Sequence, residues 1–167
     1  MSRLTDKFFA WNCVTLPLAM LLGALGVQYF LGWEPCTICV EIRAALALCT
    51  LAGLVLWIGL KWKSLLIESL ARLVLLWGAC TAFYLNIKLV LLEHHVIESF
   101  SCSPFPFYSN ILPLQEWLPY VFMSGGVCGE NTNTILGVSF TVWTAVALFF
   151  FWAFVVKGLV RLAMRLG

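Results

Sequence analysis

The sequence contains little charge. Only 11% of its 167 residues are Asp, Glu, Lys or Arg, whereas about a quarter are charged in an ordinary soluble domain. Hydrophobic residues make up 62%, more apolar surface than a soluble domain of this length can bury. The formal net charge is only +2 and no dense basic patch is present, which excludes nucleic acid as a partner. The surroundings of this chain must therefore include the lipid bilayer.

Charge is almost missing from four long stretches, each near the roughly 20 apolar residues that a spanning helix requires. These stretches are residues 8–31, 44–60, 73–92 and 134–156. We predict an all-α membrane protein, in which a four-transmembrane-helix bundle forms a single domain over residues 1–167. Residues 61–72 are too charged to span and are predicted to be a connector at the membrane surface. The first stretch is longer than a signal-peptide core, which favours an uncleaved anchor.

Positive charge is absent from the long segment between the third and fourth spans, residues 93–133. Eight of the ten cations lie at the opposite ends of the spans: Arg3, Lys7, Lys61, Lys63, Arg72, Lys157, Arg161 and Arg165. The positive-inside rule therefore places both termini in the cytoplasm, with a short loop (residues 31–39) and the long loop outside. Apolar residues from Leu114 to Phe122 recur at helical spacing, which predicts a short amphipathic surface element, interrupted at Pro119. The alternative is a hydrophobic loop packed against the helices.

The seven cysteines divide between the spans and the outer loops. Three lie inside predicted spans, where thiols behave as small apolar side chains, and we assign them no function: Cys13, Cys49 and Cys80. The other four lie in the outer loops, in the compartment where disulfides persist: Cys36, Cys39, Cys102 and Cys128. This division points to chemistry on the outer side.

Cys36 and Cys39 form a C-x-x-C pair at the start of the second span. A closely spaced dithiol is easily cycled between its two redox states, and unpaired N–H groups at a helix N-terminus stabilise a thiolate. Arg43 follows Cys39 by four residues and therefore lies on the same helical face, where it can stabilise a thiolate or a bound acceptor. The alternative for Arg43 is an interfacial cation that extends toward the headgroups.

Four loop cysteines permit three pairings and several functions. They can form two structural disulfides in a protein that is not an enzyme. A four-cysteine zinc site, or a metal carrier, is a second alternative, although zinc ligands usually come in two closely spaced sets. In the third, one pair passes electrons to the other by thiol–disulfide exchange. Transport predicts polar residues within the spans, and few are present besides Lys88 and Asn86.

The sequence resembles the DsbB family of bacterial inner-membrane disulfide-generating oxidases over essentially its whole length. The similarity rests on the four spans, on Glu34-Pro35-Cys36-Thr37-Ile38-Cys39, on Arg43, and on Cys102 with Cys128 in the second outer loop. Residues 111–128 also resemble the family's loop segment before its last cysteine. Vitamin K epoxide reductase-like proteins are the nearest alternative, but in them the loop cysteine pair precedes the C-x-x-C.

The resemblance implies a relay of disulfide exchange. A periplasmic DsbA-like thioredoxin-fold protein would attack a Cys102–Cys128 disulfide and form a mixed disulfide with Cys102. Exchange between Cys36 and Cys128 would then pass the electrons to the C-x-x-C pair. Cys39 would deliver them to a quinone of the membrane pool, either ubiquinone or menaquinone, with Arg43 supporting the negative charge.

The resemblance also implies a histidine near the quinone. The family's Glu-His element matches Glu93-His94, but here the sequence reads Glu-His-His, so that His94 and His95 are both candidates. The implied location is the bacterial inner membrane, crossed several times, with both termini in the cytoplasm.

Overall fold

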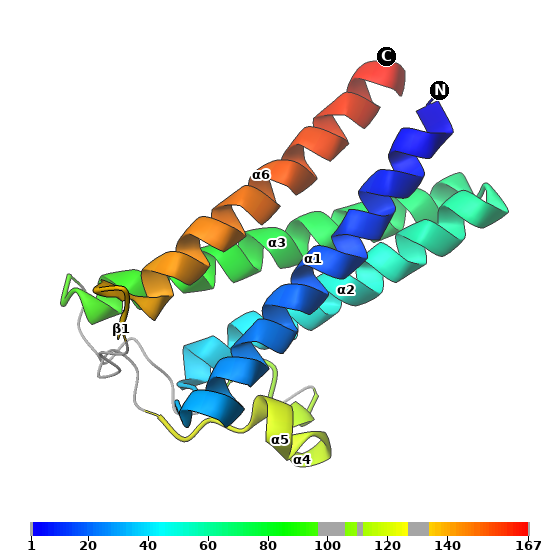
Figure 1. Ribbon diagram of the computed structural model, residues 1–167. Coiled ribbons are helices and arrows are strands. Elements are labelled where there is room, and N and C mark those ends of the chain that lie inside the picture. Colours follow the sequence, from blue (N-terminus) through cyan, green and yellow to red (C-terminus); the bar gives the residue numbers. More distant parts are fainter. Residues whose placement is uncertain (1, 97–105, 110–111, 127–133, 167) are drawn as a thin grey trace.

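The computed structural model contains four long helices that form a bundle (Figure 1). It describes residues 2–96, 106–109, 112–126 and 134–166, with side chains described from residue 5 to residue 160 within these ranges. The long helices are α1 (Ser2–Leu31), α2 (Thr37–Trp62), α3 (Leu65–Glu93) and α6 (Phe140–Leu166). Each contains an apolar window long enough to cross a membrane. The prediction of a four-helix, multi-pass membrane protein is confirmed.

The helices pack mainly in chain order. α2 packs against both α1 and α3, and α6 packs against α3, whereas α1 and α6 make few contacts with each other. Both termini lie at one end of the bundle, and the segment that joins α3 to α6 lies at the other (Figure 1). The two termini therefore lie at the same end of the four-helix bundle.

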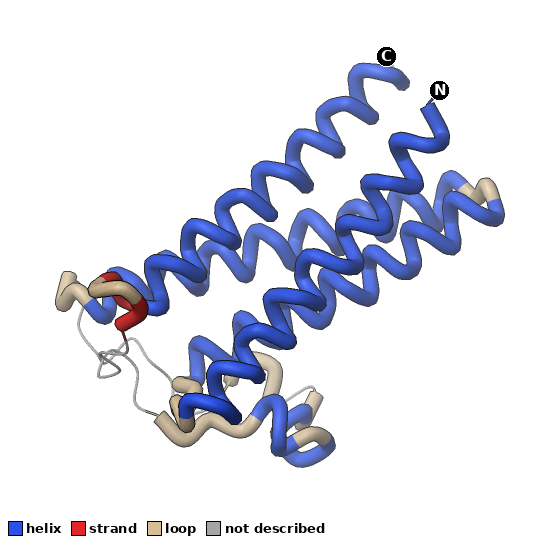
Figure 2. Tube along the Cα trace, in the orientation of Figure 1, coloured by secondary structure: helices blue, strands red, loops and turns tan. Residues whose placement is uncertain are grey.

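Two one-turn helices, α4 (Leu114–Trp117) and α5 (Pro119–Phe122), lie in the long loop (Figure 2). Pro119 occupies the first position of α5, where its missing N–H costs no hydrogen bond. The hydroxyl group of Tyr29 in α1 donates a 2.6 Å hydrogen bond to the carbonyl oxygen of Tyr120. This contact ties the short helices to the bundle.

The fourth long helix begins later than the hydropathy pattern suggests. Residues 134–139 form a hairpin of β1 (Thr134–Ile135) and β2 (Val138–Ser139), and α6 starts at Phe140. Leu136 and Gly137 have φ angles of 55° and 79°, the left-handed values that a two-residue hairpin turn requires. Hydropathy counts apolar residues and does not distinguish a short hairpin from the first turns of a helix.

The connector between the second and third spans is shorter than the predicted residues 61–72. Only Lys63 and Ser64 separate α2 from α3, and the rest of the segment is helical. Lys63 ends α2 in a left-handed conformation, with its N–H bonded to the carbonyl oxygen of Gly59. Arg72 and Glu68 form an i, i+4 ion pair at 3.2 Å. The pair stabilises two charges within the helix that a hydropathy count scores against a membrane span.

Small residues bring the helices into close contact in the middle of the bundle. A Cβ atom on Gly53 of α2 would lie 2.7 Å from the carbonyl oxygen of Cys13 in α1. A Cβ atom on Gly78 of α3 would lie 2.8 Å from the sulfur of Cys49. Cys13 and Cys49 are fully buried in the same apolar cluster, where they act as small packing residues.

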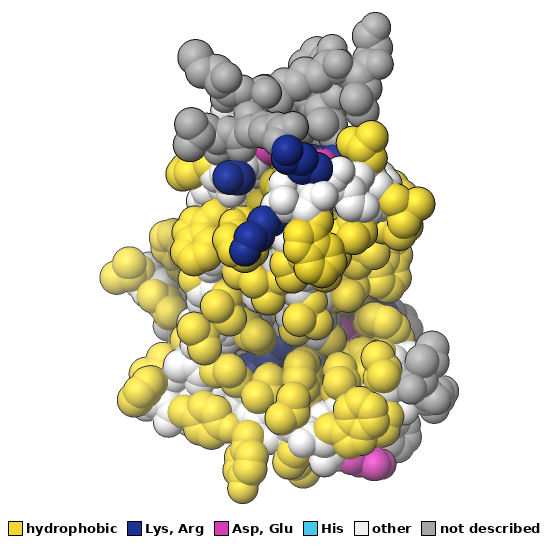
Figure 3. Space-filling model, turned by 90° about the vertical axis from the view of Figure 1, so that its right-hand side faces the viewer, with side chains coloured by type: hydrophobic (Ala, Val, Ile, Leu, Met, Phe, Trp, Pro, Cys, Tyr) yellow, Lys and Arg dark blue, Asp and Glu magenta, His cyan; other side chains and the backbone are white. Residues whose placement is uncertain are grey.

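Apolar side chains cover the outside of the bundle. Figure 3 shows one face dominated by hydrophobic side chains, with Lys and Arg gathered near the upper end, where Figure 1 places both termini. Large residues such as Trp57, Leu73 and Phe150 are exposed along the helices. An apolar belt of this kind is suited to lipid rather than water.

Candidate functional site

The C-x-x-C pair begins α2. Cys36 is the N-cap residue in an extended conformation, and its sulfur accepts a hydrogen bond from the backbone N–H of Cys39 at 3.4 Å. The sulfur atoms of Cys36 and Cys39 lie 2.8 Å apart, and both residues are free thiols. A small movement would bring the sulfurs to the bonding distance of about 2.05 Å, so the geometry suits a reversible disulfide.

The two thiols have different surroundings. The pKa of Cys36 is lowered, chiefly by the hydrogen bond that its sulfur accepts from the Cys39 thiol. Burial acts in the opposite direction, and hydrogen bonds from backbone N–H groups lower the pKa further. Cys36 is therefore the thiol that ionises more readily when the pair is reduced. Cys36 is 2% exposed and contacts the outer loop, whereas Cys39 lines a cavity inside the bundle.

Arg43 lies one turn deeper than Cys39 on the same face of α2, and only 5% of it is exposed. Its guanidinium group donates hydrogen bonds to Gln28 Oε1 at 2.6 Å, to the Val121 carbonyl oxygen at 3.1 Å and to the Ala24 carbonyl oxygen at 3.4 Å. Within the described part of the chain, all of these partners are uncharged oxygens. Arg43 is thus a buried cation that hydrogen bonds hold in place.

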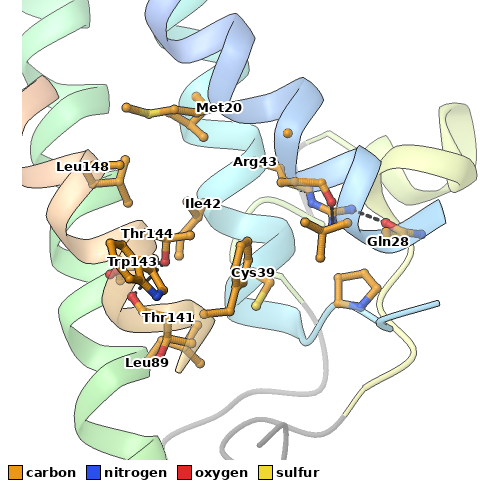
Figure 4. Close-up of a pocket in the computed structure, with 18 of the residues that line it drawn as sticks. Met20, Gln28, Cys39, Ile42, Arg43, Leu89, Thr141, Trp143, Thr144 and Leu148 are labelled. Atoms are coloured by element: carbon orange, nitrogen blue, oxygen red, sulfur yellow. Dashed lines mark hydrogen bonds between the residues drawn. The ribbon is translucent and has the colours of Figure 1, made fainter. Parts of the chain in front are cut away.

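A cavity of about 390 Å³ lies beside Cys39 and Arg43. The four long helices contribute residues spaced by whole turns, such as Met20 and Gln28 of α1, Cys39 and Arg43 of α2, Asn86 and Leu89 of α3, and Thr144 and Leu148 of α6. The close-up shows Cys39 between Arg43 and Gln28 on one side and Thr141, Trp143 and Thr144 on the other (Figure 4). The walls are mainly apolar with few polar groups, as in sites for small hydrophobic ligands.

Polar side chains join α3 to α6 along one wall of this cavity. The Nδ2 atom of Asn86 donates to Thr144 Oγ1 at 2.8 Å, and Thr144 Oγ1 donates to the Thr141 carbonyl oxygen at 2.8 Å. The hydroxyl group of Thr141 in turn donates to the carboxylate of Glu93. These bonds fix the side of the cavity that lies across from Arg43.

The outer loop returns to the start of α2 at two places. The N–H groups of Gly125 and Gly126 both donate to the Pro35 carbonyl oxygen at 3.2 Å, and Gly126 forms a bridge with Cys36. A Cβ atom on Gly125 would lie 2.9 Å from the carboxylate of Glu34, so a larger residue here would require that side chain to move. The loop backbone is therefore held directly against the dithiol.

Glu41 makes the second attachment. Its buried carboxylate accepts a 2.8 Å hydrogen bond from the backbone N–H of Phe107. The neighbouring Tyr108 packs against Val40 and Phe122, and burial together with the Glu41 carboxylate raises the pKa of Tyr108 to about 12. The sequence interpretation missed Glu41, although a carboxylate two residues before Arg43 in an apolar helix is a signal for a specific partner.

The two candidate histidines lie outside the cavity. His94 and His95 follow the end of α3, are exposed, and are not part of the cavity lining. Cys102 and Cys128 lie outside the described residues. The structure thus brings Cys36, Cys39 and Arg43 together at one site, to which it adds Gln28 and Asn86.

Comparison with known proteins finds relatives along most of the chain. The family model described as "Disulfide bond formation protein DsbB" matches residues 6–158. The chain is 32% identical over 150 residues to disulfide bond formation protein B of Shewanella loihica, which covers 88% of this chain and 85% of that protein. It is 34% identical over 148 residues to disulfide bond formation protein B 2 of Pseudomonas aeruginosa, covering 87% and 86%. For the protein of Histophilus somni the identity is 32% over 145 residues, covering 86% and 81%.

Proposed function

The chain belongs to the DsbB family of disulfide bond formation proteins, and on this basis we propose that it oxidises a periplasmic DsbA-like thioredoxin-fold protein and reduces a membrane quinone. One observation carries the proposal: Cys39 of the C-x-x-C pair and the buried Arg43 line the same apolar cavity. Its volume, apolar walls and fixed cation fit a quinone ring, which is apolar except at its two oxygens. When bound, the quinone supplies an acceptor for two electrons and two protons.

The first part of the proposed reaction takes place in the outer loop. A thiolate of the partner attacks a Cys102–Cys128 disulfide, forms a mixed disulfide with Cys102, and releases the thiolate of Cys128. The Cys128 thiolate then attacks Cys36 in the Cys36–Cys39 disulfide, which forms a Cys36–Cys128 bond and releases the Cys39 thiolate. Gly126, which is bridged to Cys36, precedes Cys128 by two positions in the sequence, and this short separation supports the proposed exchange.

The second part restores the dithiol partner to its disulfide form. The second thiolate of the partner displaces Cys102, and Cys102 then attacks Cys128 and releases Cys36. Cys36 suits this role because a thiol with a lowered pKa leaves more rapidly in disulfide exchange. The reduced pair Cys36–Cys39 then holds the two electrons beside the cavity.

Cys39 and Arg43 perform the final step on the cavity side. Cys39 is the sulfur that lines the cavity, and Arg43 lies one turn deeper on the same helical face. A fixed guanidinium in a site of low dielectric constant stabilises negative charge on the Cys39 sulfur and on the electron acceptor. Gln28 holds the guanidinium in place through its 2.6 Å hydrogen bond.

The proposed location is the bacterial inner membrane, with both termini in the cytoplasm and the dithiol facing the periplasm. The gathering of Lys and Arg near the terminal end of the bundle supports this orientation. A role for His94 or His95 at the quinone stays a prediction. Both histidines lie beyond the end of α3, whereas Cys39 and Arg43 line the cavity directly.

Purified protein, a reduced DsbA-like donor and a soluble short-chain quinone test the proposal directly. We expect the absorbance of the quinone to fall in proportion to the donor thiols oxidised, one quinone for each disulfide formed. A Cys39→Ser variant should abolish this steady reaction. If the wild-type protein oxidises no donor and reduces no quinone, its loop cysteines serve as structural disulfides and the proposed function is wrong.

A further inference from the structure

Asn86 contains a polar atom that the fold leaves without a partner. The residue is 1% exposed and lines the cavity from α3. Its Nδ2 atom donates to Thr144, whereas its Oδ1 atom is buried and has no hydrogen-bond partner among the described residues. Buried amide oxygens nearly always accept a hydrogen bond, so this oxygen indicates a donor that the described protein groups do not supply.

The hydrogen bond between α3 and α6 does not account for the missing partner of Asn86 Oδ1. Only the amide nitrogen takes part in the bond to Thr144, and the hydroxyl group of Thr144 gives its own proton to the Thr141 carbonyl oxygen. Thr141 and Glu93 already form a second bond between the same two helices. Since Oδ1 takes no part in the bond to Thr144, it can accept a hydrogen bond from a ligand while Nδ2 keeps that bond.

Two of the polar side chains that line the cavity differ in their chemistry. Arg43 offers only N–H donors, whereas Asn86 Oδ1 offers an acceptor. Thr144, the partner of Asn86, lies across Cys39 from Arg43 (Figure 4). A quinone carries only acceptors on its ring, but a 1,4-quinol carries a hydroxyl donor at each end.

We propose that Asn86 is a specificity-determining residue that accepts a hydrogen bond from the hydroxyl group of the quinol and so makes the cavity prefer the reduced ligand. This inference rests on the proposed quinone site. The overall conversion is balanced: two thiols and one quinone give one disulfide and one quinol, with both protons transferred. A preference for quinol raises the midpoint potential of the bound couple and favours oxidation of the Cys36–Cys39 pair, and each tenfold of preference corresponds to about 30 mV.

Binding measurements without turnover test the inference. The full-length Cys39→Ser protein cannot form the C-x-x-C disulfide, so an oxidised and a reduced ligand can each be titrated without reacting. The probes are decylubiquinone and decylubiquinol under anaerobic conditions, and the signal is quenching of tryptophan fluorescence, since Trp33 and Trp143 line the cavity. We expect Asn86→Leu in this background to weaken quinol binding about tenfold and quinone binding less than threefold.

Thr144→Val is the matched control because it removes the same bond between α3 and α6 but keeps the Asn86 amide. We expect its ratio of quinol to quinone affinity to stay close to that of the parent, even where both affinities fall. Asn86→Ala repeats the test with a smaller side chain, should Asn86→Leu not fold.

The outcomes separate this inference from the proposed function. If Asn86→Leu and Asn86→Ala reduce both affinities by one common factor, or weaken quinone more than quinol, the inference is wrong and Asn86 only shapes the cavity. If the parent binds neither ligand, the proposed quinone site fails, and the inference with it. If Arg43→Ala weakens ligand binding but Asn86→Leu leaves the ratio of quinol to quinone affinity unchanged, the quinone site stands and only the inference about Asn86 is wrong.

Discussion

Replacement of Arg43 gives the sharpest test of the cavity. Arg43 is 5% exposed, and among the described residues its guanidinium bonds only to neutral oxygens, so no described carboxylate forms an ion pair with it. Removing a single preorganised donor from a site where negative charge develops typically costs about 10²–10³ in kcat, or about 3–4 kcal/mol. We expect Arg43→Ala to lower kcat/KM for the quinone by this factor. Arg43→Lys should be intermediate, since lysine keeps the charge but loses the planar fork of donors.

The assay must separate the cavity from the thiol relay. Quinone reduction is measured against quinone concentration, alongside the stoichiometric first turnover of the reduced donor without added quinone. We expect Arg43→Ala to keep the first turnover, because the attack on the loop disulfide does not involve the cavity. Arg72→Ala is the control: Arg72 is also a buried arginine, but its partner is Glu68 in α3 and it does not line the cavity.

Stability has to be followed in the same variants. Arg43→Ala leaves the acceptors on Gln28, Val121 and Ala24 without their donor, which should destabilise the fold by about 1–3 kcal/mol. A thermal shift measured in detergent reports this loss independently of the kinetics. If folded Arg43→Ala protein retains wild-type quinone kinetics, then Arg43 has only a structural role and the acceptor binds elsewhere.

Three further predictions concern the thiols and the loop. Cys128→Ser should trap a stable mixed disulfide between Cys102 and the partner, detectable on a non-reducing gel; a trapped species on Cys36 would contradict the order of the relay. Because its pKa is lowered, Cys36 in the reduced protein should be alkylated by iodoacetamide with a midpoint below that of an ordinary cysteine thiol, and Cys39→Ala should move this midpoint upward. Glu41→Leu should free the bound loop amide and increase proteolysis of the loop, with a cost of about 1–3 kcal/mol, whereas Glu41→Gln keeps an acceptor and should resemble wild type.

Sequence patterns could predict the number of spans but not where each one starts. Hydropathy begins the second span at Ala44, after the charges of Glu41 and Arg43, whereas the helix begins at Thr37. The earlier start is possible because both charged groups form hydrogen bonds with other segments. Glu41 accepts one from the backbone N–H of Phe107 in the loop, and Arg43 donates one to Gln28 in α1. A count of apolar residues along the chain contains no information on such partners.

The candidate site was predictable where it depends on one helix and hidden where it depends on packing. Cys39 and Arg43 could be placed on one face of α2, with Cys36 at its start, from their spacing alone. Gln28 and Asn86 belong to other helices, and only the packing of α1 and α3 against α2 brings them to the same cavity. Asn86 was visible in the sequence as an isolated polar residue in a span, without any sign of what it faces.

The C-x-x-C pair at the first turn of α2 connects two different environments, the outer loop and the cavity. Cys36 belongs to extended backbone paired with the loop, and Cys39 belongs to the cavity wall, although only one helical turn separates them. In the proposed reaction a single covalent bond between these sulfurs joins the loop side of the site to the cavity side. The partner protein and the lipid-soluble acceptor could then exchange an electron pair without direct contact. The binding surface for one could therefore change without altering the binding surface for the other.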